Sequence, residues 1–161
     1  MVAKANRRMR TNRLPVEIIQ GSIEKVPIAD NHFDFILSES VLSFVNKPLA
    51  LKEIFRLLKK GGRFIAIEQT INQPLKEEEE NEIKQFYGFE SLTTKKDWVR
   101  LLKQAGFKHI RIQKNTSIDS EPDFHYSDNI EPELYEIMKK HFDLTFNHIG
   151  NLGYRIYSCT K

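Results

Sequence analysis

The chain has 161 residues, a formal net charge of +3 and a composition of 40% hydrophobic and 29% charged residues. These proportions are typical of one soluble globular domain, and no apolar run approaches the roughly 18 residues that a membrane span needs. The single cysteine, Cys159, excludes an internal disulfide and suits a reducing compartment, so we predict a cytoplasmic protein.

Short apolar runs predict the strands. We expect strands at residues 16–19, 33–37 and 64–67, since short apolar runs suit strands that are covered on both faces. Residues 109–112 alternate polar with apolar side chains, which favours a place nearer the edge of a sheet. Residues 154–159 close the chain as a fifth strand.

Apolar stripes at helical spacing predict the helices between these strands. The first helix begins near Pro48 and continues through Lys60, with Gly61 in the left-handed conformation that often ends a helix. The second lies between an N-cap at Thr94 and a stop at Gly106. A third follows Pro132. The stripes of the first two consist of Leu51, Ile54, Phe55 and Leu58, and of Trp98, Leu101, Leu102 and Ala105.

Two segments do not fit this alternation of strands and helices. Residues 70–91 are polar and are predicted to be helical in their middle, whereas residues 115–130 are predicted to form a loop. Insertions of this kind often cover binding sites. We therefore predict an α/β fold with a mainly parallel sheet, in a single domain over residues 1–161 with variable cover segments at 70–91 and 115–130.

Residues 19–34 resemble a signature of the class I S-adenosylmethionine-dependent methyltransferases. In that family a strand ends in Gly-Asp-Ala-Glu, and Asn-x-Phe-Asp opens the next strand. Here the corresponding residues are Gly-Ser-Ile-Glu at 21–24 and Asn-His-Phe-Asp at 31–34. Residues 35–45, 51–64, 86–87 and 98–107 are similar to the elements that follow in type 11 small-molecule methyltransferases, in the same order and at normal spacing.

The resemblance implies a partial Rossmann-like methyltransferase fold, with a mainly parallel sheet and an antiparallel last strand. The family's Gly-x-Gly-x-Gly loop and the acidic residue after its second strand do not occur in these 161 residues. The chain thus resembles an N-terminally truncated domain in which the first two family strands are missing. We expect methyltransferase activity to be absent or impaired in this chain alone.

The resemblance also implies S-adenosylmethionine as cofactor and a small molecule as methyl acceptor. By position, Ser22 and its neighbours match the residues that contact the adenine ring of the cofactor. Ser38 and Glu39 match the residues near its methionine end. Ser40 and Ser43 match residues that line the space between cofactor and acceptor. The family usually has Asp where this chain has Ser22, a hydroxyl that also accepts hydrogen bonds. The predicted cofactor-binding residues are Gly21, Ser22, Ile23, Ser38, Glu39, Ser40 and Ser43.

No residue has a spacing that identifies it as a general base, so the catalytic residues stay unassigned. His125 and Tyr126 lie in the loop that could approach the acceptor, although a surface histidine is the more frequent case. His141 and His148 lack the spacing and the partners of a metal site, and no metal is expected.

Loss of two strands would leave an apolar strand edge at residues 33–37, which favours a homo-oligomer formed through that edge. An alternative function is therefore a non-catalytic dimerising or regulatory module derived from the methyltransferase fold. Nucleic-acid binding is least favoured, because no aromatic side chains interleave with Arg7, Arg8, Arg10 and Arg13. No membrane partner is expected.

Overall fold

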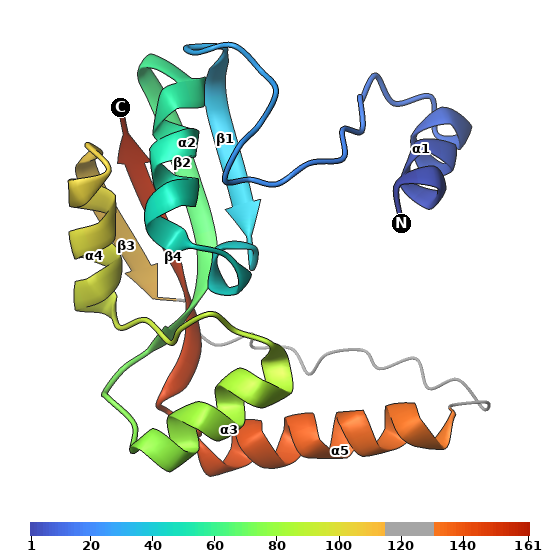
Figure 1. Cartoon of the computed structure of the whole chain (residues 1–161), viewed down its shortest axis with the longest axis vertical. Helices are drawn as coiled ribbons and strands as arrows, with labels where there is room; N and C mark the ends of the chain where they lie inside the picture. Colours follow the sequence, from blue (N-terminus) through green and yellow to red (C-terminus); the bar gives the residue numbers. More distant parts are fainter. Residues whose placement is uncertain (115–130) are drawn as a thin grey trace.

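The computed structural model describes residues 1–114 and 131–161. Within these residues one sheet has the strand order β1-β2-β4-β3 (Figure 1). The strands are β1 (Phe33–Glu39), β2 (Leu58–Ile71), β3 (Lys108–Lys114) and β4 (Leu152–Thr160). β1 pairs with β2 in parallel, and β4 lies antiparallel between β2 and β3. The predicted sheet, mainly parallel with an antiparallel last strand, is confirmed, and β3 lies at an edge as expected.

Two helices cover one face of this sheet, and two others lie beyond its end (Figure 1). The covering helices are α2 (Lys47–Leu57) and α4 (Lys95–Gln104), and the helices beyond the sheet are α3 (Glu77–Tyr87) and α5 (Pro132–Asn147). A short 3-10 helix, η1 (Leu42–Phe44), precedes α2. The helix α1 (Val2–Thr11) lies apart from the sheet, has no buried residue and is joined to the rest by an extended segment (Figure 1).

The hydrophobic core lies between the sheet and the helices α2 and α4. The predicted stripes supply much of it, because Leu51, Ile54, Leu58, Trp98 and Leu102 are each at most 1% exposed. The predicted N-cap of α4 is also confirmed. Thr94 Oγ1 accepts from Asp97 N at 3.2 Å, while the Asp97 carboxylate accepts from Thr94 N at 3.3 Å. This reciprocal pair satisfies two donors that a helix start otherwise leaves free.

Residues 16–19 do not form the predicted strand. Val16 and Ile19 are both 49% exposed and lie in an extended segment outside the sheet. Apolar composition alone does not make a strand, because its backbone groups need a neighbouring strand to pair with. The described residues therefore form four strands rather than the five expected.

The helix α2 is shorter than predicted. It ends at Leu57, and Lys59 and Lys60 belong to β2. Gly61 does adopt the left-handed conformation, with φ of +78°, but it does so inside the strand-forming segment. The Lys161 Nζ group donates to Leu58 O at 2.7 Å, so the chain end occupies one carbonyl just beyond this helix.

The helical middle predicted for residues 70–91 is confirmed by α3, and the helix after Pro132 by α5. The other predicted cover segment, residues 115–130 with His125 and Tyr126, lies outside the described residues. None of the described helices is long and apolar enough to cross a membrane.

Candidate functional site

The predicted cofactor residues of the 38–43 segment lie at the carboxyl end of β1. The strand ends at the exposed Glu39, and the chain turns at Ser40, whose φ is +53°. The Ser40 N–H donates to Ile67 O on β2 at 2.8 Å, so the turn stays attached to the neighbouring strand. The carboxyl ends of parallel strands are where open α/β sheets place ligands.

A buried carboxylate, Glu68 on β2, holds this turn in place. Its side chain is fully buried, and Oε1 accepts hydrogen bonds from Ser38 Oγ at 3.2 Å, Val41 N at 3.3 Å and Leu42 N at 3.1 Å. Its Oε2 accepts from Ser43 Oγ at 3.4 Å. Two predicted cofactor residues, Ser38 and Ser43, therefore direct their hydroxyls inward to Glu68.

A second buried ionisable side chain, Lys47, lies at the start of α2. Burial raises the pKa of Glu68, although its four hydrogen bonds oppose that rise. Burial likewise lowers the pKa of Lys47, while the attraction of Glu68 and of Glu90 opposes that fall. Lys47 is 3% exposed, and its ammonium donates to Ser91 O at 3.1 Å and to Ser91 Oγ at 2.9 Å. Two buried ionisable side chains thus adjoin the candidate site.

The second predicted cofactor segment, Gly21 to Ile23, lies in the loop before β1. Gly21 and Ser22 are exposed, and Ser22 Oγ accepts from Glu24 N at 3.2 Å. Ile23 packs against the core. The carboxylate of Glu24 accepts from Asn46 N at 2.8 Å, which ties this loop to the residue between η1 and α2. This hydrogen bond joins two residues that follow the predicted segments 21–23 and 38–43 along the chain.

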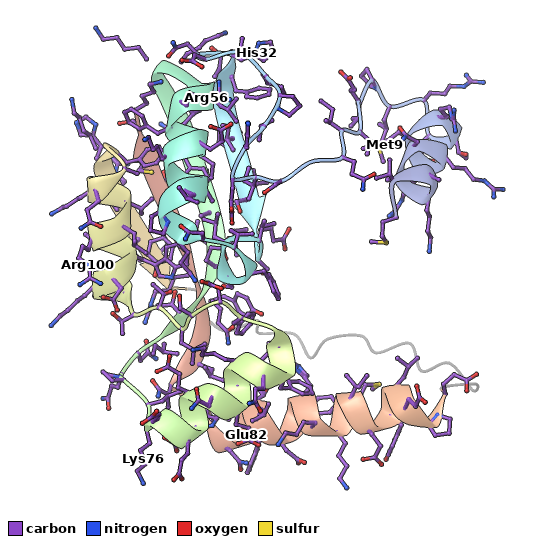
Figure 2. All side chains as sticks on the ribbon, in the orientation of Figure 1. Met9, His32, Arg56, Lys76, Glu82 and Arg100 are labelled. Atoms are coloured by element: carbon purple, nitrogen blue, oxygen red, sulfur yellow. The ribbon has the colours of Figure 1, made fainter. Side chains whose placement is uncertain are left out.

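A second anchor, Arg56, fixes the loop further along. Arg56, labelled on α2 in Figure 2, donates to Ile28 O at 2.9 Å and to Val26 O at 3.1 Å. Glu53 Oε1 accepts from Val26 N at 2.7 Å, and Glu53 also forms an ion pair with Arg56 at 2.7 Å. The hydrogen bond from Arg56 is the largest cause that lowers the pKa of Glu53 to about 2.

Glu68 and Lys47 are the functional residues that sequence reasoning missed. An acidic residue directly after the apolar run 64–67 is a signal that could have identified Glu68, because a buried strand carries a carboxylate only where donors meet it. Lys47 gave no such signal, since lysine at a helix start is ordinarily solvated. Among the described residues, no group of three histidine, cysteine or acidic side chains is placed to hold a metal ion.

Comparison with known proteins points to the class that the sequence resembles, the methyltransferases. A family model described as a methyltransferase domain matches residues 1–66. The uncharacterized methyltransferase YodH of Bacillus subtilis is 29% identical over 165 residues, and the match covers 100% of this chain and 71% of that protein. The resemblance noted from the sequence is confirmed, and the chain is similar in sequence to methyltransferases.

Solved structures give the fold in more detail. A structure named after sarcosine dimethylglycine methyltransferase, from Galdieria sulphuraria, has a TM-score of 0.82 at 18% identity, and the match covers 99% of this chain. A geranyl diphosphate C-methyltransferase from Streptomyces coelicolor, in complex with Mg²⁺, geranyl diphosphate and S-adenosyl-L-homocysteine, has a TM-score of 0.71 at 16% identity. The chain spans 65% and 59% of these two structures. Their likeness to this chain is one of fold.

Proposed function

We propose that the chain is part of an S-adenosylmethionine-dependent methyltransferase that acts on a small molecule. The observation that carries the proposal is the turn at residues 38–43, which Glu68 holds at the carboxyl end of β1. Asn46, shortly after this turn, is hydrogen-bonded to Glu24 in the loop of Ser22. The methyltransferase domain match covers both segments. The activity, the acceptor and the partners of the whole protein are part of this proposal.

The groups exposed at this end of the sheet suit such a cofactor. The Glu39 carboxylate is exposed at the strand end, where it can accept hydrogen bonds from an ammonium group. The Ser22 hydroxyl and the half-buried Ile23 offer one hydrogen-bonding group and one apolar surface to an adenine ring. The space around Gly21 is open, which leaves room for a ligand beside its backbone.

The remaining predicted residues, Ser38, Ser40 and Ser43, act by positioning the chain at the end of β1. S-adenosylmethionine, when bound, supplies a methyl group on a sulfonium that is already a good leaving group, so the protein mainly aligns the reactants and excludes water. Ser38 and Ser43 contribute through the turn they hold with Glu68. Ser40, in its left-handed conformation, redirects the chain from β1 toward η1.

A ligand-induced rise in melting temperature tests this assignment, because a ligand that binds only the folded state stabilises it. We expect S-adenosylhomocysteine to raise the melting temperature of the wild-type chain. Glu39→Ala should reduce that rise, whereas Glu77→Ala, on α3, should leave it unchanged. Equal rises in the two variants would contradict the assignment of Glu39.

The exposed edge of β1 supports a second element of the proposal, a homo-oligomer. Phe35 and Leu37 are 49% and 57% exposed, and β1 pairs only with β2 among the described strands. The same edge favours the alternative function, a non-catalytic dimerising or regulatory module with this fold. The two functions differ in cofactor binding, which only the methyltransferase requires.

Three expectations from the sequence remain part of the proposal. The lone cysteine, Cys159, is buried in β4, which agrees with a cytoplasmic location. We also retain the expectation that methyl transfer by this chain alone is impaired. Residues 70–91 and 115–130 remain assigned as covers of the acceptor side.

A further inference from the structure

A cavity of about 270 Å³ lies between α3, α5 and the adjoining ends of β2 and β4. Its lining includes Tyr87, Phe89, His141, Thr145, Leu152 and Tyr154. The volume is near the lower end of the range of small-molecule pockets, roughly 300 to 1,000 Å³. None of the described residues that line it is aspartate, glutamate, lysine or arginine.

This cavity adjoins the candidate cofactor site. The ring of Phe89 lies 5.2 Å from the ring of Phe44 in η1, and the Glu90 N–H donates to Ser43 O at 2.9 Å. The wall of the cavity therefore rests on the segment that Glu68 holds. A molecule in the cavity would therefore lie near that turn.

The helices that form the cavity are joined by a hydrogen-bonded ring pair. Tyr87 OH lies 2.9 Å from His141 Nδ1, and the two rings meet edge to face. Tyr87 stacks on Phe89 with ring centroids 5.0 Å apart. An ion pair between Lys140 and Glu82 joins the same two helices outside the cavity lining. Glu82 is labelled on α3 in Figure 2.

The hydrogen bond between Tyr87 and His141 bears on the proton of the imidazole. Thr145 Oγ1 donates to His141 O at 2.8 Å and so joins consecutive turns of α5. In the contact between Tyr87 OH and His141 Nδ1 either atom can be the donor. A neutral imidazole that donates its Nδ1–H keeps its lone pair on Nε2.

We propose that this cavity binds the methyl acceptor as an uncharged ring bearing a hydroxyl group, and that His141 Nε2 accepts the hydroxyl proton. This inference rests on the proposed function. The acceptor oxygen forms a bond to the methyl carbon while the carbon–sulfur bond breaks and its electron pair stays on sulfur. The hydroxyl proton passes to Nε2 of His141, in the tautomer whose Nδ1–H donates to Tyr87 OH.

The side chains that line the cavity favour one chemical class of methyl acceptor. Stacked aromatic walls suit a flat ring, because offset stacking adds to the burial of its apolar surface. A protonated amine would instead favour a carboxylate, and none is present among the described lining residues. The partners of His141 lie on α3 and on the next turn of α5, so the spacing of residues in the sequence did not indicate this role.

The test uses 4-nitrophenol, whose ionised form has its own absorption band, at a pH at which most of the free probe is protonated. We expect the wild-type chain to bind the probe and to produce the nitrophenolate band. His141→Gln should still bind it but lower the ionised fraction about tenfold, the equivalent of one pKa unit. Tyr87→Phe, which keeps the stacked ring, should lower the fraction in the same direction.

The matched control is His109→Gln, because His109 lies on β3 outside this cavity and pairs with Thr160. It should behave as the wild type. A probe that does not bind the wild-type chain, or an unchanged band in His141→Gln, would overturn the proposal. The readout needs no cofactor, so its failure is separate from a failure to bind S-adenosylhomocysteine. Melting curves of each variant confirm that it is folded.

Discussion

At the scale of single residues, Glu68 connects the sheet to the candidate site. Its carboxylate satisfies two backbone N–H groups and two hydroxyls in a fully buried position. A buried donor that loses its acceptor reduces stability by more than the net value of the hydrogen bond, because no water can reach the donor to replace the acceptor. The predicted residues Ser38 and Ser43 thus depend on a residue that the sequence pattern did not identify.

Replacing Glu68 tests this dependence. Glu68→Ala leaves Val41, Leu42 and both hydroxyls without their acceptor, so we expect a loss of about 1–3 kcal/mol in the free energy of unfolding. Glu68→Gln keeps one carbonyl oxygen toward Val41 and Leu42 and should recover much of that loss. Urea unfolding measures both. Equal stability of Glu68→Ala and the wild type would show that the turn is held in some other way.

The pKa of Glu53 predicts a response to acid. The carboxyl has its ordinary pKa of 4.5 in the unfolded chain and a pKa of about 2 in the folded one, where Arg56 donates to it. A lowered folded pKa stabilises the protein above pH 4.5, and this contribution is lost as the pH falls from 4.5 toward 2. Glu53→Gln should flatten the stability curve in that interval.

Urea unfolding at several pH values between those limits gives the curve. The control is Lys52→Gln on the same helix, which changes a charge without adding a group that titrates below pH 5. A curve for Glu53→Gln as steep as that of the control would contradict the role of this ion pair.

At the scale of elements, the sequence predicted most of the sheet and the helices that cover it. The stripes of α2 and α4 and the cap at Thr94 follow from local rules and are confirmed. The strand expected at residues 16–19 required a partner strand, which no local pattern specifies. The contact between α3 and α5 also depends on residues far apart in the sequence, so the cavity between them was not predictable from spacing.

The cap of α4 provides a quantitative test of the local rules. Thr94→Ala removes the acceptor of the Asp97 N–H, and we expect a loss of about 1 kcal/mol in the free energy of unfolding. Lys96→Ala, at an exposed position of the same helix, should change it by less than about 0.5 kcal/mol. Thermal or urea unfolding distinguishes the two, and equal effects would contradict the capping role.

At the scale of the whole molecule, the exposed edge of β1 predicts self-association. An edge strand with half-exposed Phe35 and Leu37 is a template for pairing with another strand. We expect the wild-type chain to sediment as a dimer or larger species at tens of micromolar, and Leu37→Lys to shift it toward monomer. Glu77→Lys, on α3 away from this edge, should leave the association unchanged. A monodisperse wild-type monomer would contradict this prediction.

The central claim is that residues 21–23 and 38–43 form one side of a site for S-adenosylmethionine. The most direct test is calorimetric titration of the purified chain with S-adenosylhomocysteine. We expect saturable heat that diminishes in Glu68→Ala, since the turn of Ser40 then loses its support. No detectable heat at millimolar ligand would contradict the claim and would leave the fold as a scaffold for association.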